Sequence, residues 1–229
     1  MTANPLQARL TPSRVGGEIA AIVVLSVVGM IVGALTPWVI MGPILGMVFP
    51  LLAATWFLQR QGIGWRDLGF PNRMPLGRFL WLTLAVLIAT VVIVNLILTP
   101  VMRWLGAPPV DVSMLAQLIE GDFRMYLLFL IPVGWVSAAF GEELLMRGFV
   151  LNRLTAVMGT SWAVVLQALL FSLGHAYQGV TGMVSVFVVG VLLAIVYLRA
   201  NRNLWPAIAA HGLINTMSIT LMYLGYTTM

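Results

Sequence analysis

Seven long apolar runs divide the chain, and each is about as long as a membrane-spanning helix. Hydrophobic residues make up 61% of the 229 residues, whereas charged residues make up only 8%. A soluble domain cannot bury this much apolar surface, because globular chains are roughly half apolar and a quarter charged. A helix needs roughly 20 apolar residues to cross about 30 Å of hydrocarbon. The predicted spans are 17–36, 38–58, 79–101, 125–146, 161–177, 181–199 and 204–224.

The surrounding lipid determines the fold class. A backbone within the hydrocarbon has to satisfy its own hydrogen bonds, so the spans are predicted to be helices. Segments with turn residues separate the runs, as at 64–78 and 106–113. The first run has no clear signal-peptide cleavage site and is expected to be retained as an anchor. We therefore expect an all-α, polytopic transmembrane helical bundle of about seven spans, with a range of six to eight.

The twelve basic residues are all arginines, and their distribution predicts an orientation. With a cytoplasmic N-terminus, ten arginines fall at or near the inner face and two fall outside, as the positive-inside rule requires. The inner ten are Arg9, Arg14, Arg60, Arg66, Arg73, Arg78, Arg147, Arg153, Arg199 and Arg202, and the outer two are Arg103 and Arg124. The arginines form no dense basic run, so we expect a lipid bilayer and no nucleic acid as a partner.

Three ionisable residues stand inside the fourth apolar run, in the stretch GEELLMR at 141–147. Glu143 and Arg147 are four apart in the favourable acid-before-base order, so they can form an ion pair on one helix face. Glu142 lies about 100° around the helix and has no basic residue three or four positions away. A solvated helix end or a structural ion-pair cluster would explain the group. Ionisable residues within spans usually face a cavity or a partner, which makes Glu142 a candidate functional residue.

The only two histidines, His175 and His211, both lie in predicted spans. A single intramembrane histidine more often serves helix packing than catalysis. Here Gln167, Phe171 and His175 recur every four residues, and His211 and Asn215 are also four apart, so each histidine shares a helix face with a polar residue. The polar groups of three C-terminal helices are therefore predicted to converge on one hydrated cavity.

A carboxylate and two imidazoles around one cavity support two forms of amide hydrolysis. Glutamate and histidine can act as general base toward water, while a His–Asn pair donates hydrogen bonds to the oxyanion. Alternatively, Glu142, His175 and His211 supply three ligands to Zn²⁺ and leave the fourth position to water. Cysteine is absent, which excludes a thiolate nucleophile, and the chain has no HExxH motif. Both alternatives stay open on these residues alone.

Three short blocks in this half of the chain carry a family resemblance. EELLMR at 142–147 fits the pattern EExxxR, FSLGH at 171–175 fits FxxxH, and HGLIN at 211–215 fits HxxxN. In this order, on successive hydrophobic helices, they resemble the CPBP family. That family comprises CAAX proteases of the Ras-converting type and bacteriocin-processing or self-immunity relatives. WRDLGF at 65–70 is similar to a segment common before the family core.

The resemblance implies an intramembrane protease core at 120–229, in the four C-terminal helices, preceded at 1–119 by transmembrane helices and a cytoplasmic loop. Its substrate would be a peptide or protein at the membrane, prenylated (CAAX-type) or otherwise membrane-associated. The implied catalytic residues are Glu142, His175, His211 and Asn215, and the supporting residues are Glu143 and Arg147. The first two catalytic residues would activate water, and the last two would stabilise the oxyanion. We expect the metal-independent mechanism, with zinc as the alternative, in a bacterial plasma membrane.

Two other classes of function compete with the protease. A non-enzymatic scaffold or bacteriocin self-immunity protein would keep the motif residues for helix packing, but it has no need of an unpaired Glu142. A transporter or proton relay is disfavoured, because the first half has no acidic pair in an inverted, matching position. Its one acid within a span, Glu18, is expected at the membrane interface. Substrate identity and oligomeric state do not follow from the sequence.

Overall fold

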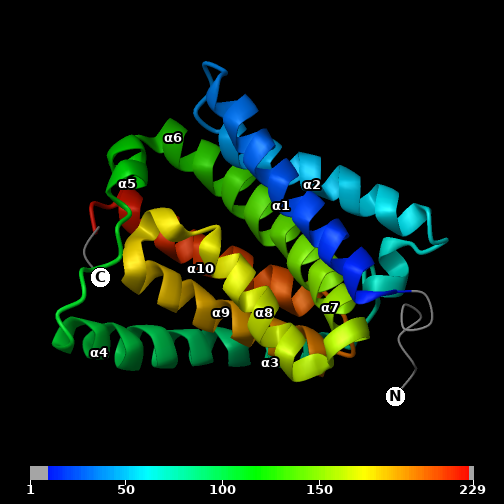
Figure 1. The fold of residues 1–229 in the computed structure, drawn as a ribbon. Helices are drawn as coiled ribbons and strands as arrows, with labels where there is room; N and C mark the ends of the chain where they lie inside the picture. The colour runs from blue at the N-terminus through cyan, green and yellow to red at the C-terminus, as the bar shows by residue number, and fades with distance from the viewer. Residues whose placement is uncertain (1–9, 227–229) are drawn as a thin grey trace.

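The computed structural model describes residues 10–226, so Arg9 lies outside the described residues. All regular structure in this range is helical, which confirms the all-α, polytopic bundle (Figure 1). Five helices of this range are long and apolar enough to cross a membrane, and the chain is an integral membrane protein. They are Pro12–Ala34, Met41–Gln59, Leu76–Trp104, Phe123–Met158 and Ala176–Arg199.

Several of the long helices change their hydrogen-bonding pattern along their length. The elements in chain order are α1 (Pro12–Ala34), α2 (Met41–Gln59), η1 (Trp65–Leu68), α3 (Leu76–Thr90), η2 (Val91–Leu98), α4 (Thr99–Trp104), α5 (Ser113–Ile119), α6 (Phe123–Leu128), η3 (Phe129–Glu142), η4 (Leu144–Leu151), α7 (Asn152–Met158), α8 (Thr160–Leu173), η5 (Ala176–Gln178), α9 (Gly179–Arg199) and α10 (Trp205–Tyr223). Of these, η1 and η5 are 3₁₀ turns, whereas η2, η3 and η4 are π-helical.

Each of the seven predicted spans coincides with one helical rod, but two rods are not among the five membrane-length apolar helices. The first, α8, has 14 residues. Its length is about 21 Å, which is less than the thickness of the hydrocarbon. The second, α10, has 19 residues and carries polar side chains along its length. These two rods carry most of the two histidine blocks, and α8 is excluded from the five by its short length.

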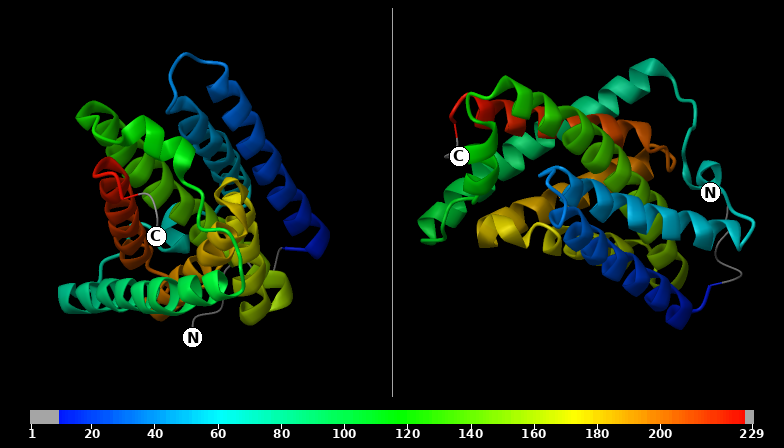
Figure 2. Two further views of the ribbon diagram at one scale, coloured as in Figure 1. Left: turned by 90° about the vertical axis from the view of Figure 1, so that its left-hand side faces the viewer. Right: turned by 90° about the horizontal axis from the view of Figure 1, so that it is seen from above.

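The hairpin of α1 and α2 lies at the edge of the bundle (Figures 1 and 2). Its helices approach closely at Gly29 and Gly33, which are four residues apart. A Cβ atom at Gly29 would collide with the carbonyl of Leu45, and one at Gly33 would collide with the carbonyl of Met41. Small residues at this spacing let membrane helices pack backbone to backbone.

A buried ion pair joins this hairpin to the rest of the protein. Glu18 is only 5% exposed, and its Oε2 lies 2.8 Å from Nε of Arg153, which is 0% exposed. Its Oε1 accepts hydrogen bonds from Arg14 at 3.0 Å and from Gln61 at 3.2 Å. Glu18 is therefore buried within the protein, where pairing with Arg153 offsets the cost of burying its charge.

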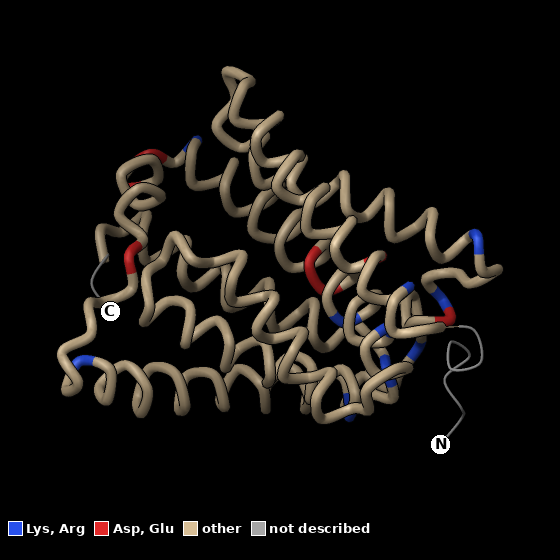
Figure 3. Tube along the Cα trace, viewed as in Figure 1, with Lys and Arg blue, Asp and Glu red and all other residues tan. Residues whose placement is uncertain are grey.

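The WRDLGF segment packs against the C-terminal helices. Its residues form η1, and the hydroxyl of Tyr197 donates to the carbonyl of Leu68 at 2.8 Å. Gly69 follows with φ of 102°, and a Cβ atom there would collide with the carbonyl of Arg202. Only glycine fits this conformation and this close approach. The segment lies at the end of the bundle where most arginines gather (Figure 3).

One continuous rod, Phe123–Met158, crosses the middle of the bundle and carries the first motif block (Figure 1). Asp122 caps its start, since its Oδ1 accepts from the backbone N–H groups of Arg124 and Met125. Gly159, with φ of 82°, ends it. The rod is longer than the predicted span 125–146. Much of it is π-helical, a backbone form that is rare and often found at functional sites.

Candidate active site

The two adjacent glutamates lie where η3 meets η4, and their surroundings differ. The side chain of Glu143 is 0% exposed, whereas that of Glu142 is 20% exposed. Within the described structure, Oε2 of Glu142 is buried and accepts no hydrogen bond. Glu143 contacts neighbouring side chains through its Oε1 atom. Oε2 of Glu143 likewise accepts no hydrogen bond in the described structure, so what distinguishes Glu142 is its partial exposure, which lets a ligand reach it.

Glu143 and Arg147 together connect three helices. Oε1 of Glu143 accepts from Nη1 of Arg147 at 2.7 Å and lies 2.8 Å from Nδ1 of His211 on α10. Arg147 is fully buried and also donates from Nη2 to the carbonyl of Gly190 on α9 at 3.0 Å. The i, i+4 ion pair is therefore present, and it also positions a histidine on another helix.

The contact with Glu143 fixes the orientation of the His211 ring. A carboxylate only accepts hydrogen bonds, so we assign a proton to Nδ1. The other ring nitrogen, Nε2, then faces Glu142, whose Oε2 is 3.9 Å away. A histidine held through one nitrogen by a carboxylate presents its second nitrogen in a defined direction. The nearest imidazole to Glu142 is thus His211.

His175 lies outside a helix, in contrast to the predicted span 161–177. The helix α8 ends at Leu173, and His175 precedes the turn η5. Its Nδ1 is 2.9 Å from the carbonyl of Phe171, and Nε2 has no hydrogen bond or ion pair with any residue in the range 10–226. Glu142 is 17 residues before the Gly159 turn and His175 is 16 after it, so the hairpin places them at a similar level.

The ring of Phe171 connects the two histidines. Its centroid is 4.9 Å from that of His175 and 6.0 Å from that of His211. The guanidinium of Arg147 lies over the same ring, 4.7 Å from its centre. Among residues 10–226, no hydrogen bond or ion pair joins His175 to Glu142. The structure gathers both histidine blocks and the EELLMR block into one cluster but places Glu142 closer to His211.

Asn215 lies one helical turn beyond His211 on α10. Its Nδ2 donates to the carbonyl of Gly134 at 2.9 Å, so one amide N–H is used and the second remains available. In the next contact along this interface, Nε1 of Trp135 donates to the hydroxyl of Thr216 at 3.0 Å. Comparison with the contact between Glu143 and His211 shows that α10 runs antiparallel to the rod of η3. Asn215 therefore lies about 6 Å along α10 from His211.

Tyr177 is a site neighbour that the sequence did not single out. Its ring stacks on that of His175 at a centroid distance of 6.1 Å, and its hydroxyl accepts from Nε2 of Gln178 at 3.1 Å. The signal for it was ambiguous, because tyrosines are common at the ends of membrane helices.

The residues do not fit the alternative mechanism in which zinc is bound. Within residues 10–226, no three His, Asp or Glu side chains come together as a group that could hold a metal ion. In each histidine Nδ1 contacts another group, Glu143 for His211 and the carbonyl of Phe171 for His175, so Nε2 is the nitrogen that could bind a ligand. The side chains of Glu142, His175 and His211 are not gathered as a metal-binding group in residues 10–226, so the proposed reaction uses a water activated by Glu142.

The comparisons with known proteins locate the same region. Residues 124–217 match the family model described as type II CAAX prenyl endopeptidase Rce1-like. No curated protein and no solved structure matches the chain significantly. The matched segment begins in α6, ends in α10 and contains all three motif blocks. The predicted resemblance is confirmed for this segment: the part of the chain that builds the site is similar to type II CAAX prenyl endopeptidases of the Rce1-like family.

Proposed function

We propose that the protein is an intramembrane endopeptidase that cleaves a prenylated (CAAX-type) or otherwise membrane-associated peptide with a water activated by Glu142. The carrying observation is that Oε2 of Glu142 accepts no hydrogen bond in the described structure and faces Nε2 of His211 at 3.9 Å. This separation exceeds a direct hydrogen bond. It is short enough for one water molecule to contact both atoms.

In the proposed reaction, Glu142 takes a proton from the water as general base. The oxygen of the water attacks the carbonyl carbon of the peptide bond and produces a tetrahedral oxyanion. When this intermediate collapses, the carbon–nitrogen bond breaks and Glu142 returns the proton to the leaving amine. His175, with Nε2 free, lies across Phe171 as a second acceptor for protons of the water or the amine.

His211 and Asn215 are the proposed oxyanion donors. Glu142 and Glu143 carry two negative charges against the single positive charge of Arg147, and a protonated His211 makes the cluster neutral. Its Nε2–H then points to the oxyanion while Nδ1–H is held by Glu143. The free N–H of Asn215 supplies a second donor. Such preorganised donors are often the largest single contribution to catalysis.

The test is peptide cleavage by Glu142→Gln in proteoliposomes, followed by mass spectrometry. Substrates are a farnesylated CAAX peptide and the same peptide without the prenyl group. Glu142→Gln keeps the shape of the side chain and is expected to lower turnover by about 10²–10⁴-fold, the contribution of a general base. Glu120→Gln is the control, because it makes the same change at an exposed residue outside the site. Wild-type turnover by folded Glu142→Gln would refute the mechanism.

The burial of the Glu143–Arg147–His211 cluster also suits a scaffold without enzymatic activity. If the protein is a scaffold, the wild type cleaves no membrane peptide. Glu142→Gln is then also expected to leave partner binding unchanged. Cleavage that depends on Glu142 separates the two functions.

Removal of metal ions by chelation gives an independent test of the metal-free mechanism. Cleavage is expected to persist after exhaustive chelation verified by metal analysis. Loss of activity that zinc restores would contradict the roles assigned to Glu142 and His211.

A further inference from the structure

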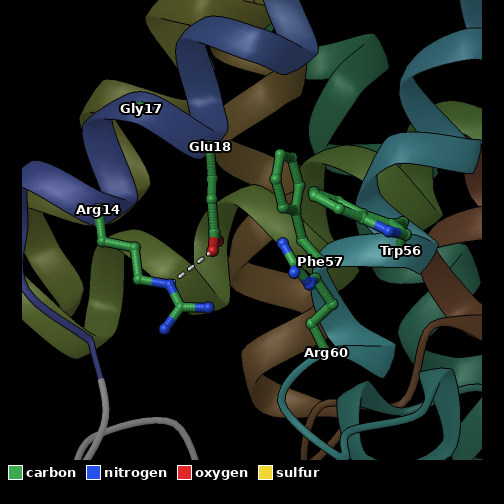
Figure 4. Close-up of a pocket in the computed structure, with 6 residues that line it drawn as sticks. All are labelled: Arg14, Gly17, Glu18, Trp56, Phe57 and Arg60. Atoms are coloured by element: carbon green, nitrogen blue, oxygen red, sulfur yellow. Dashed lines mark hydrogen bonds and ion pairs between the residues drawn. The ribbon is translucent and has the colours of Figure 1, made fainter.

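A pocket of about 320 Å³ lies between the start of α1 and the end of α2, away from the candidate active site. Its volume is within the range of small-molecule sites. Figure 4 shows the six lining residues, which are Arg14, Gly17, Glu18, Trp56, Phe57 and Arg60. Arg14 on α1 and Arg60 on α2 stand on opposite sides of it. None of these residues takes part in the proposed cleavage.

The pocket carries a surplus of positive charge. Glu18 is its only acid, and both carboxylate oxygens of Glu18 have partners in Arg153 and Gln61. Arg14 and Arg60 line the pocket, and the buried Arg153 also pairs with Glu18 behind it, so three positive charges lie in or next to the pocket against this single negative charge. Arg14 also contacts Glu18, but its side chain is 44% exposed and its Nη atoms are left to bind an anion.

Aromatic and apolar residues continue from the pocket along α2. The guanidinium of Arg60 lies over the ring of Trp56 at 4.5 Å, an arrangement in which the ring supports the cation. Val48, Leu52, Trp56 and Arg60 recur every four residues and so share one helix face. All four are exposed. Along this face a cationic side chain is followed by a tryptophan and then by aliphatic side chains. A membrane-spanning helix has the same order of residues from the lipid headgroups to the hydrocarbon.

We propose that this pocket binds the phosphate of an anionic phospholipid, whose acyl chains lie along the exposed face of α2. Arg14 and Arg60 hold the phosphate oxygens from opposite sides, and Trp56 packs at the glycerol level. Gly17 keeps the pocket open, because it has no side chain where the lipid phosphate enters. Charge complementarity and the position at the ends of two membrane-length helices together select a lipid over a soluble anion.

Lipid binding to the full-length protein in detergent is measured by native mass spectrometry during titration with phosphatidylglycerol. Phosphatidylcholine and sn-glycerol 3-phosphate serve as the zwitterionic and the soluble comparisons. A basic residue near a membrane surface contributes about fivefold in affinity for anionic lipid. The double variant Arg14→Gln/Arg60→Gln is therefore expected to bind phosphatidylglycerol about 30-fold more weakly, whereas Arg73→Gln, an exposed arginine elsewhere, is expected to bind like the wild type.

A steric variant tests the same site without a change of charge. A Cβ atom at Gly17 would meet nothing within 4 Å, so Gly17→Leu is expected to fold and to fill the pocket. It should weaken binding of phosphatidylglycerol at least tenfold. Gly16→Leu is the matched control, because Gly16 is equally unobstructed but does not line the pocket.

Unchanged binding in both the double arginine variant and Gly17→Leu would overturn the proposal. Equal affinity for sn-glycerol 3-phosphate and phosphatidylglycerol would overturn it as well, since the occupant would then be a soluble phosphate ester. These outcomes do not depend on peptide cleavage.

Discussion

Replacement of Arg147 by methionine tests how the buried charge cluster stabilises the protein. The substitution keeps a long apolar side chain but leaves Glu143, which is 0% exposed, with His211 as its remaining partner. Removing one partner of a buried ion pair costs about 3–5 kcal/mol, because the other charge stays buried without compensation.

The other two contacts of Arg147 add little to this figure. The carbonyl of Gly190 keeps Nε2 of Gln167 as a donor at 3.3 Å, so it is not left without a hydrogen bond. The cation–π contact with Phe171 is replaced by a sulfur–aromatic contact of similar strength. The expected loss therefore remains about 3–5 kcal/mol. It corresponds to a decrease in Tm of roughly 6–20 °C for a chain of this size.

The assay is thermal unfolding of the purified protein in detergent, followed by tryptophan fluorescence. Arg73→Met, at an exposed arginine, is the control and should change Tm by less than about 2 °C, as surface substitutions usually do. The double variant Glu143→Gln/Arg147→Met removes both charges and should recover more than half of the lost stability. The reasoning is refuted if Arg147→Met is as stable as Arg73→Met, or if the double variant is less stable than Arg147→Met.

Three further predictions address packing, catalysis and pH. A Cβ atom at Gly212 would overlap the ring of Trp135, so Gly212→Ala should destabilise the protein by about 1–3 kcal/mol in thermal unfolding. Gly16→Ala is the control, because a Cβ atom at Gly16 meets no other atom, and it should not destabilise the protein. Equal Tm values for the two variants would contradict this prediction. Asn215→Ala should lower peptide turnover by about 10²–10³-fold, and unchanged turnover would remove Asn215 from the oxyanion site. Hydrogen bonds from the hydroxyl and backbone N–H of Ser113 lower the pKa of Asp111. Because the folded-state pKa is the lower one, the stabilisation is present above the unfolded pKa of about 4 and is lost as pH falls through the folded value. NMR of the Ser113 amide should show this titration, and Asp111→Asn should abolish it.

Features within a single helix could be predicted from the sequence. The apolar runs required helices because lipid cannot satisfy backbone hydrogen bonds, and the structure has a helical rod at each of the seven positions. The Glu143–Arg147 pair followed from the spacing of four residues, because such residues share a helix face. The three motif blocks likewise lie within the segment that matches the protease family.

Contacts between helices were not determined by these local patterns. The ion pair of Glu18 with Arg153 joins residues far apart in sequence, and no spacing rule connects them. The same holds for the contact of Glu143 with His211. His175 was predicted inside a span because the apolar run continues past Leu173, whereas the chain turns there. The end of α8 depends on packing against neighbouring helices.

The sequence alone determined that this chain is a membrane-embedded helical bundle with a few ionisable residues in its C-terminal half. The tertiary structure decided how those residues pair: Glu143 holds His211, His211 faces Glu142, and the two histidines meet across Phe171. The physical reason is that helix periodicity fixes directions within one rod. The depth and rotation of each rod are set by close packing with the others, as at Gly212 against Trp135.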